Sequence, residues 1–343
     1  MPTSIIVGAP TLKPNQEMLD SIAQNLRCYD YQPSRLDLRE TVIKGLSRPR
    51  KQLPPLLFYC NEYGSDLFNQ ICDLPEYYPT RTEIRILEEN KEEIAQFLGD
   101  RILLVEYGSG SGKKVYPLLN SLSDPVAYMP IDISKEHLFS YSELTSQKYP
   151  HLETIAVVAD YTRDLDLPEC QNQTPSKKAI YFAGSTIGNL ENHEAIDLLK
   201  KSAQRVGKGG GMLIGTDLKK EPRILHSAYN DAAGVTAKFN LNMLTIINSQ
   251  LGADFNLDRF YHYAFYNPIR GRIEMHLISA CPQVVTIDNY QFAFEEGESI
   301  HTENSHKYGE EEFRELAEAA GFTLEKTWTD PDRLFGVRYL SLS

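Results

Sequence analysis

The sequence predicts an α/β protein whose core is a mainly parallel sheet with helices on both faces. Five short apolar runs recur through the middle of the chain, separated by segments long enough for helices, and this is the pattern of βαβ units. After residue 217 the alternation stops, and longer helical and alternating patterns indicate a second module. The five runs are 102–107, 126–132, 154–160, 179–184 and 212–217.

Composition and charge narrow the classes of function. The chain has 343 residues, of which 41% are hydrophobic and 24% charged, which is typical of a globular protein long enough for two domains. The formal net charge of -12 disfavours nucleic acid and anionic membranes as partners. We find no signal-peptide pattern, no apolar run near the ~20 residues of a membrane span, and no CxxC pair among the five cysteines. We expect a cytoplasmic protein with reduced thiols, and a monomer.

Local patterns predict the remaining elements. Helical composition extends from Thr82 to Leu98, with Thr82 as the N-cap. Alternation predicts two antiparallel strands at 272–281 and 284–294, and a closing pair at 323–329 and 334–342. Further helices are expected within 18–45 and at 66–73, 221–251 and 310–320, with a loop at 46–56.

These patterns divide the chain into two interleaved modules. The α/β core is predicted at 82–219 and again at 307–343. A second module, at 19–81 and 220–306, is therefore split in sequence around the core. Residues 1–18 carry several prolines without clear periodicity and are expected to form a flexible N-terminal arm.

The most informative local motif is the glycine-rich turn at 108–112, G-S-G-S-G, after the first predicted strand. A turn from strand to helix needs positive φ angles and close approach of the backbone, which glycine allows at low cost. The dinucleotide fingerprint G-x-G-x-x-G would place its last glycine at Lys113, and so would the phosphate-binding loop G-x-x-x-x-G-K-[ST]. The spacing is instead G-x-G-x-G, the form usual in S-adenosylmethionine-dependent methyltransferases.

Side chains at the next strand ends fit the same cofactor. Asp132 can accept hydrogen bonds from both ribose hydroxyls of a nucleoside, and Asp160 can accept from the adenine amino group with Tyr161 beside the ring. Lys114 can meet the methionine carboxylate. One such aspartate often only caps a helix, but their occurrence in consecutive βα units favours a nucleoside site. The expected cofactor contacts are Gly108, Ser109, Gly110, Lys114, Asp132, Asp160, Tyr161 and Gly184.

Five longer motifs occur in one order along the chain: LPEYYPTR at 74–81, GSG at 108–110, GSTIGN at 184–189, DAAGVT at 231–236 and IEMHL at 273–277. Through them the chain, from about residue 35 to its C-terminus, resembles the histidine-specific N-alpha-methyltransferase family of ergothioneine biosynthesis. The resemblance implies a Rossmann-like class I methyltransferase core and an α+β substrate-binding domain split in sequence. The implied reaction uses S-adenosylmethionine to trimethylate the α-amino group of L-histidine, giving hercynine (histidine betaine) and S-adenosylhomocysteine.

The resemblance also implies the residues of an amino-acid pocket. Asn189 corresponds to a residue that holds the substrate carboxylate or amine, and Tyr59 to a tyrosine beside the amine, although one extra residue lies between Tyr59 and Gly64. These two are the expected catalytic residues. Glu303 and Ser305 correspond to a Glu-x-Ser pair that grips the imidazole. The other expected substrate contacts are Tyr77, Tyr229 and Met275, the last a wall of the pocket.

The segment around Glu303 departs from the family at Asn304, where an apolar residue is expected. If side chains alternate, Asn304 points away from Glu303 and Ser305. Without the resemblance, the string E-N-S-H-K would favour a solvated loop. His301 and His306 flank Glu303, but their spacing fits no zinc signature, so we expect surface histidines and no metal site.

Three other functions remain open from the sequence. A paralogue could methylate another amino acid, such as tyrosine or tryptophan, but Glu303 and Ser305 suit an imidazole, which has one donor and one acceptor when neutral. A non-catalytic S-adenosylmethionine-binding protein is disfavoured by the intact glycine turn, Asp132 and a full pocket. A nucleic-acid or protein methyltransferase is disfavoured by the acidic charge.

Overall fold

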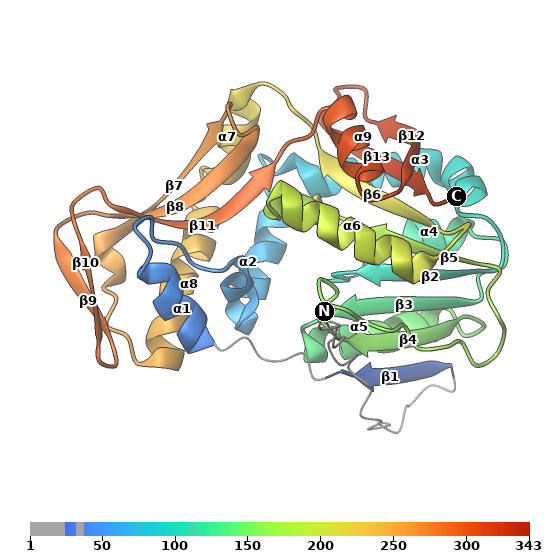
Figure 1. The fold of residues 1–343 in the computed structure, drawn as a ribbon, viewed down its shortest axis with the longest axis horizontal. Helices are drawn as coiled ribbons and strands as arrows, with labels where there is room; N and C mark the ends of the chain where they lie inside the picture. The colour runs from blue at the N-terminus through green and yellow to red at the C-terminus, as the bar shows by residue number, and fades with distance from the viewer. Residues whose placement is uncertain (1–24, 32–37, 111, 113) are drawn as a thin grey trace, which may run out of the picture.

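A sheet of eight strands runs through one half of the molecule (Figure 1). The structure is a computed structural model that describes residues 25–31, 38–110, 112 and 114–343, so the expected arm at 1–18 lies outside the described residues. The strands are β1 (Leu26–Asp30), β2 (Ile102–Tyr107), β3 (Ala127–Asp132), β4 (Glu153–Val158), β5 (Lys177–Phe182), β6 (Gly211–Asp217), β12 (Thr323–Thr329) and β13 (Phe335–Ser341).

The strand order is β1-β4-β3-β2-β5-β6-β13-β12. Strands β1 to β6 are parallel to one another, and β13 runs antiparallel to β6 and β12 on its two sides. The five predicted core strands are confirmed, and their ends differ from the prediction by no more than two residues. Because the chain returns to the other side of β2 after β4, the strand order reverses between β2 and β5, and such folds bind ligands at the carboxyl ends of the strands at this point.

Helices cover both faces of this sheet, as a Rossmann-like fold requires (Figure 1). Successive residues of β2 pack into different hydrophobic clusters: Leu103 and Val105 into one that includes α6 and α9, and Leu104 into one that includes α3 and α4. The predicted α/β class is therefore confirmed. The helices of this half are α3 (Tyr78–Leu98), α4 (Tyr116–Ser121), α5 (Lys135–Lys148), α6 (Asn192–Val206) and α9 (Glu310–Glu318), with the 3-10 helix η2 (Thr186–Asn189).

The second half of the molecule has its own core and a separate three-stranded sheet of order β11-β8-β7. The predicted pairing of 272–281 with 284–294 is wrong, because β8 pairs with β7 and β11, and 284–294 folds on itself at Asp288, whose φ of 51° permits a tight turn. The predicted helical region 221–251 contains two helices. The elements are α1 (Leu38–Leu46), η1 (Pro55–Tyr59), α2 (Glu62–Asp73), α7 (Pro222–Tyr229), α8 (Val235–Leu251), η3 (Leu257–Arg259), β7 (Phe260–Asn267), β8 (Arg272–Ser279), β9 (Gln283–Ile287), β10 (Tyr290–Phe294) and β11 (Ser299–His306).

Two further predictions are corrected by the structure. Helices were expected within 18–45, but 26–30 form β1, which pairs with β4 and so belongs to the core sheet rather than to the module expected at 19–81. A strand of five residues at a sheet edge is too short to produce a clear period. Thr82 is not an N-cap, because α3 begins at Tyr78 and Pro79 occupies its first turn, where proline is favoured.

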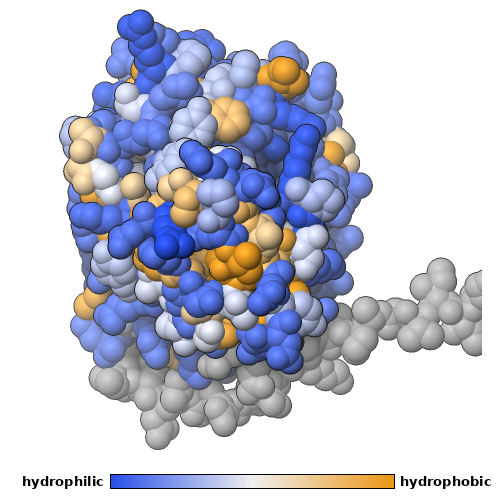
Figure 2. Space-filling model, turned by 90° about the vertical axis from the view of Figure 1, so that its left-hand side faces the viewer, coloured by the Kyte–Doolittle hydropathy of each residue, from blue (hydrophilic) through white to orange (hydrophobic). Residues whose placement is uncertain are grey.

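The end of the molecule formed by β9, β10 and α1 is mostly hydrophilic, with a small apolar area near its middle (Figure 2). Val284 and Tyr290, on β9 and β10, are among the exposed large apolar side chains, and single residues of this kind are common on soluble surfaces. Within the described ranges, no helix is both long and apolar enough to cross a membrane.

Candidate active site

The glycine turn after β2 has the backbone that a closely bound ligand requires. Gly108, Gly110 and Gly112 all have positive φ, at 65°, 49° and 66°. A Cβ on Gly112 would lie 1.7 Å from the ring of Tyr141, so no other residue fits there. The hydroxyl of Ser109 is buried and has no hydrogen-bond partner among the described residues. The glycines allow a ligand to approach the backbone closely, and the Ser109 hydroxyl is an unpaired polar atom; both features fit a nucleoside cofactor.

The end of β3 lies against this turn through Asp132. One carboxylate oxygen of Asp132 accepts from the backbone N–H of Gly110 at 3.3 Å, and the other from that of Ser134 at 2.9 Å. Burial raises the pKa of Asp132, while these backbone donors oppose the shift. Its position at the switch point is the one predicted for a ribose-binding carboxylate.

Tyr161 and Asp160 follow β4 at the same edge of the sheet. The ring of Tyr161 stacks on Tyr107, with centroids 4.9 Å apart, and lies 3.8 Å from where a Cβ of Gly108 would be. The carboxylate of Asp160 accepts from the backbone and hydroxyl of Thr162 and pairs with Arg163. Tyr161 therefore lies beside the glycine turn, and contacts of Tyr161 and Asp160 with the adenine stay predictions.

A buried glutamate that the sequence did not reveal connects Lys114 with Gly184. Glu83, on α3, is fully buried, pairs with the ammonium of Lys114 at 2.9 Å and accepts from the backbone N–H of Gly184 at 2.9 Å. Lys114 is thus held beside Gly184 at the carboxyl ends of β2 and β5. A single glutamate on a long helix gives no sequence signal of this role, and the contact of Lys114 with the cofactor stays a prediction.

The residues predicted for the amino-acid pocket come together from both halves of the molecule. The amide of Asn189, at the end of η2, donates to the Glu303 carboxylate at 3.3 Å. The phenol of Tyr229, at the end of α7, donates to the Ser305 hydroxyl at 2.7 Å. The rings of Tyr77 and Tyr229 meet edge to face at 6.2 Å. Met275 is opposite Glu303 in the β8–β11 register.

Tyr59 ends η1 in the second half of the molecule. Its ring packs against Phe68 and Phe239, and 43% of the residue is exposed. The protein packed around the phenol, followed by the charge of Glu303, raises the pKa of Tyr59 well above its ordinary value, and the charge of Asp132 acts in the same direction. A contact of Tyr59 with the substrate amine stays a prediction.

Strand β11 presents Glu303 and Ser305 on one face and Asn304 on the other. The amide of Asn304 donates to Glu191 at 3.1 Å, and Asn304 is opposite Glu274 in the register. The predicted alternation is confirmed, and the loop alternative for this string is wrong.

The neighbouring histidines differ from the prediction. His306 is only 8% exposed, and His301 is partly buried with its Nε2 3.0 Å from the backbone carbonyl of Glu303, so neither is a surface histidine. His301 is covered because the loop at 46–56 pairs with β11 there, and His306 because its backbone lies against Gly188 of η2; the sequence indicated neither contact. Within the described ranges, no group of three histidine, cysteine or carboxylate side chains could hold a metal ion.

A buried lysine supports the pocket from behind. The ammonium of Lys307 lies 2.7 Å from Asp217 and donates to the Ser305 hydroxyl at 2.8 Å and the Tyr229 phenol at 3.1 Å. Burial raises the pKa of Glu303 to about 7, against the opposing effect of Lys307. A carboxyl with a perturbed pKa inside a cavity is a common mark of a functional site. Lys307 was not predicted, because its only signal in the sequence is its place two residues after Ser305.

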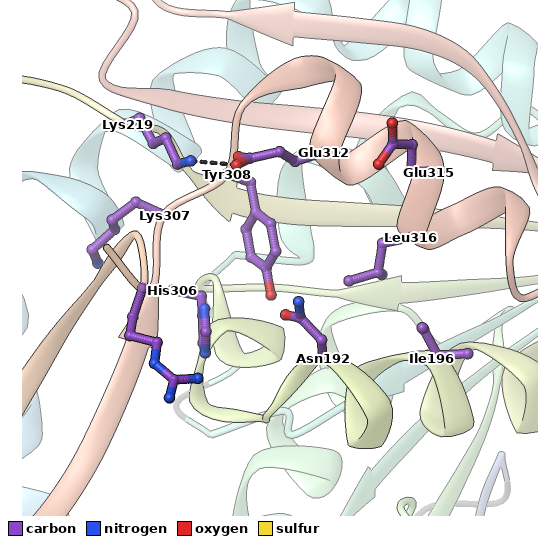
Figure 3. A pocket seen from close by; sticks show the side chains of 10 residues that line it. Asn192, Ile196, Lys219, His306, Lys307, Tyr308, Glu312, Glu315 and Leu316 are labelled. Atoms are coloured by element: carbon purple, nitrogen blue, oxygen red, sulfur yellow. Dashed lines mark hydrogen bonds and ion pairs between the residues drawn. The ribbon is translucent and has the colours of Figure 1, made fainter. Parts of the chain in front are cut away.

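Two cavities lie near this site. A cleft of about 960 Å³ between the loop at 48–55, the start of α6 and β11 is lined mainly from the Asn304 face of β11, and Asn189 and Glu303 also line it. A smaller pocket of about 290 Å³ lies between α6 and α9 (Figure 3). There Lys219 pairs with Glu312, while the side chain of Lys307 points away from the centre of the pocket. The smaller pocket is therefore separate from the amino-acid pocket.

This fold and cofactor site define an S-adenosylmethionine-dependent methyltransferase. The profile of the family described as "Histidine-specific methyltransferase, SAM-dependent" matches residues 38–342. The histidine N-alpha-methyltransferases of Mycolicibacterium smegmatis and Mycobacterium tuberculosis are 40% and 37% identical to the chain, each over 88% of its length and 93% and 94% of their own. The chain belongs to this histidine-specific methyltransferase family.

Relatives of lower identity include an N-methyltransferase named for a different substrate. A 4-dimethylallyltryptophan N-methyltransferase of Epichloe festucae var. lolii is 30% identical over 89% of this chain and 94% of its own length. The solved structure of the CcbJ methyltransferase from Streptomyces caelestis covers 74% of this chain and 95% of its own, with 15% identity and a TM-score of 0.43.

Proposed function

We propose that this protein transfers three methyl groups from S-adenosylmethionine to the α-amino nitrogen of L-histidine, giving hercynine as the first step of ergothioneine biosynthesis. The observation that carries the proposal is the short segment from Gly184 to Asn189. Gly184 lies beside Lys114 and the buried Glu83, and Asn189 donates to Glu303. This segment joins the predicted cofactor site to the predicted amino-acid pocket, which supports direct transfer between two bound molecules.

The residues of the pocket suit methyl transfer to an amine. The bound cofactor supplies a methyl group on a sulfonium, so the attacking nitrogen must be unprotonated and held in line with it. Tyr59 and Asn189 can orient that nitrogen without adding charge beside it. Placing the reacting atoms in line supplies much of the rate, so no strong base is needed. Because a dimethylated amine has no N–H once it is deprotonated, the last step requires space and tolerates the loss of donor contacts.

Histidine is favoured over an indole substrate by the polar pair on β11. Glu303 and Ser305 project from one face of β11, where Ser305 is buried and Glu303 is partly buried. An indole has one donor and no basic ring nitrogen, so it would leave the second polar group unpaired, which is costly in a closed site. The higher identity with the histidine enzymes supports the same choice.

The assignments of individual residues and segments are part of this proposal. The substrate-binding domain comprises 38–81 and 220–306, and the methyltransferase core 82–219 and 307–343 together with β1. The mono- and dimethylated histidines are further substrates, the chain is a monomer, and it resides in the cytoplasm, which its five unpaired cysteines support. The proposed substrate contacts are Tyr59, Tyr77, Asn189, Tyr229, Met275, Glu303 and Ser305, and the proposed cofactor contacts are Gly108, Ser109, Gly110, Lys114, Asp132, Asp160, Tyr161 and Gly184.

The test is direct methylation. The pure protein is incubated with S-adenosylmethionine and each of the twenty amino acids, and products are followed by mass. We expect histidine to gain three methyl groups. Histidine unchanged while another amino acid gains methyl groups would overturn the proposal. In the same assay Glu303→Ala should weaken histidine use strongly while leaving cofactor binding intact. An equal loss of cofactor binding would show that the assignment of Glu303 to the amino-acid pocket is wrong.

A further inference from the structure

The polar groups behind the amino-acid pocket determine which role the Ser305 hydroxyl can play. An ammonium carries three donors and no acceptor, and Lys307 directs its three toward Asp217, Tyr229 and Ser305. Lys307 is 2% exposed. Burial alone would lower its pKa, but Asp217 and Tyr229 raise it above its ordinary value, so the ammonium stays charged.

The phenol of Tyr229 adds a second donor to the same oxygen. It accepts from Lys307 and has one hydrogen of its own. Ser305 is the only acceptor within reach of that hydrogen among the described residues, and the phenol is the more acidic of the two hydroxyls, so Tyr229 donates at 2.7 Å. Both lone pairs of the Ser305 oxygen are then occupied, by Lys307 and by Tyr229. The hydrogen of Ser305 remains, and the hydroxyl can act toward a ligand only as a donor.

Glu303 supplies the opposite role two residues earlier on the same face of β11. One of its oxygens accepts from the amide of Asn189 at 3.3 Å, which leaves the other oxygen able to accept a ring N–H. The pocket thus offers one acceptor and one donor, in fixed places.

We infer that the site binds the imidazole as the neutral ring in a single tautomer, and that Lys307 is a specificity-determining positioning residue which enforces this by keeping Ser305 a donor. The inference rests on the proposed use of histidine. A neutral imidazole has one N–H for Glu303 and one lone pair for Ser305. An imidazolium has two N–H groups, so it would bring a donor against the Ser305 donor, and its charge would approach that of Lys307.

The test compares the binding of two ligands as the pH changes. Dissociation constants of L-histidine and of 1,2,4-triazole-3-alanine, whose ring stays neutral over this range, are measured by calorimetry with S-adenosylhomocysteine bound. Where both ligands bind with a neutral ring, titration of Glu303 affects them alike, so the ratio of the two constants isolates the histidine ring. With a ring pKa of ~6.5, the neutral fraction falls about tenfold from pH 7.5 to pH 5.5. We expect the relative affinity for histidine to fall about tenfold in the wild type.

Two variants test the part played by the lysine. Lys307→Met frees one lone pair of Ser305, so the hydroxyl can accept from an imidazolium and the tenfold fall should shrink to about twofold or less. Tyr229→Phe frees the other lone pair and keeps the Lys307–Asp217 pair, so it serves if the first variant does not fold. Lys219→Met, at a half-exposed lysine paired with Glu312, should keep the wild-type fall. If Lys307 had only a structural role, its replacement would weaken the binding of both ligands equally, and the ratio of their dissociation constants would depend on pH as in the wild type.

The outcomes separate this inference from the proposed function. A pH-independent ratio in the wild type would overturn the neutral-ring inference, and a tenfold fall that persists in both variants would overturn the role of Lys307. In either case histidine could still be methylated. Failure of histidine to gain methyl groups would instead remove the proposed function itself.

Discussion

Replacement of Glu303 by glutamine should stabilise the protein in a pH-dependent way. Burial raises the pKa of Glu303 from its ordinary 4.5 to about 7. Between these values the folded protein holds a proton that the unfolded chain has released, so the free energy of unfolding falls as the pH rises. From pH 5 to pH 8 this loss amounts to at most about 2.5 kcal/mol. Glutamine cannot ionise, so Glu303→Gln should gain that amount relative to the wild type over the same interval.

The measurement is urea denaturation of both proteins at pH 5 and pH 8 without ligand. Glu296→Gln, at an exposed glutamate of the turn after β10, is the matched control and should change by less than ~0.5 kcal/mol between the two pH values. If Glu303→Gln changed as little as this control, or lost stability at pH 8, the carboxylate of Glu303 would already be fully satisfied by Asn189 and Lys307. In that case Glu303 would have no unpaired carboxylate oxygen left to accept a ring N–H of the substrate.

Two more variants test the division between cofactor and substrate contacts. Asp132→Asn should weaken S-adenosylhomocysteine binding by about 10- to 100-fold, because a hydrogen bond to a charged acceptor contributes roughly 1.5–3 kcal/mol; calorimetry that finds unchanged affinity would remove Asp132 from the cofactor site. Asn304→Leu should leave the affinity for histidine within about threefold, because the side chain lies on the face of β11 away from Glu303; a loss beyond ~30-fold would place Asn304 in the pocket.

Most of the core sheet could be predicted because its strands are buried on both faces. β2, β4 and β6 are buried along their whole length, so their sequences are short and mainly apolar, and their regular recurrence between helical segments indicates a parallel sheet. The edge strand β1 is partly exposed at four of its five residues and was predicted as helix. Strand β7 was missed for a similar reason, since its exposed face carries tyrosines that give no alternation in hydropathy.

The two halves of the site differ in what the sequence reveals. Cofactor residues follow the ends of successive parallel strands, and parallel strands end at one edge of a sheet, so chain order alone placed Asp132 near the glycine turn. The pocket residues come from separate elements of two interleaved modules, and only a family resemblance connected them. Glu83 and Lys307 were not predicted, because the sequence does not distinguish a single charged residue on the surface from one that is buried in a hydrogen-bond network.

A bulge in β11 explains why no simple pattern could have separated Glu303 from the histidine two residues before it. Residues i and i+2 of a strand share a face, so His301 and Glu303 should both enter the pocket. The register with β8 shifts between them: His301 is opposite His276, whereas Glu303 is opposite Met275. Because consecutive residues of β8 point to opposite faces, the extra residue, Thr302, leaves Glu303 in the pocket and turns His301 to the other side. The bulge thus keeps a second basic ring away from the carboxylate proposed to read the substrate's own imidazole.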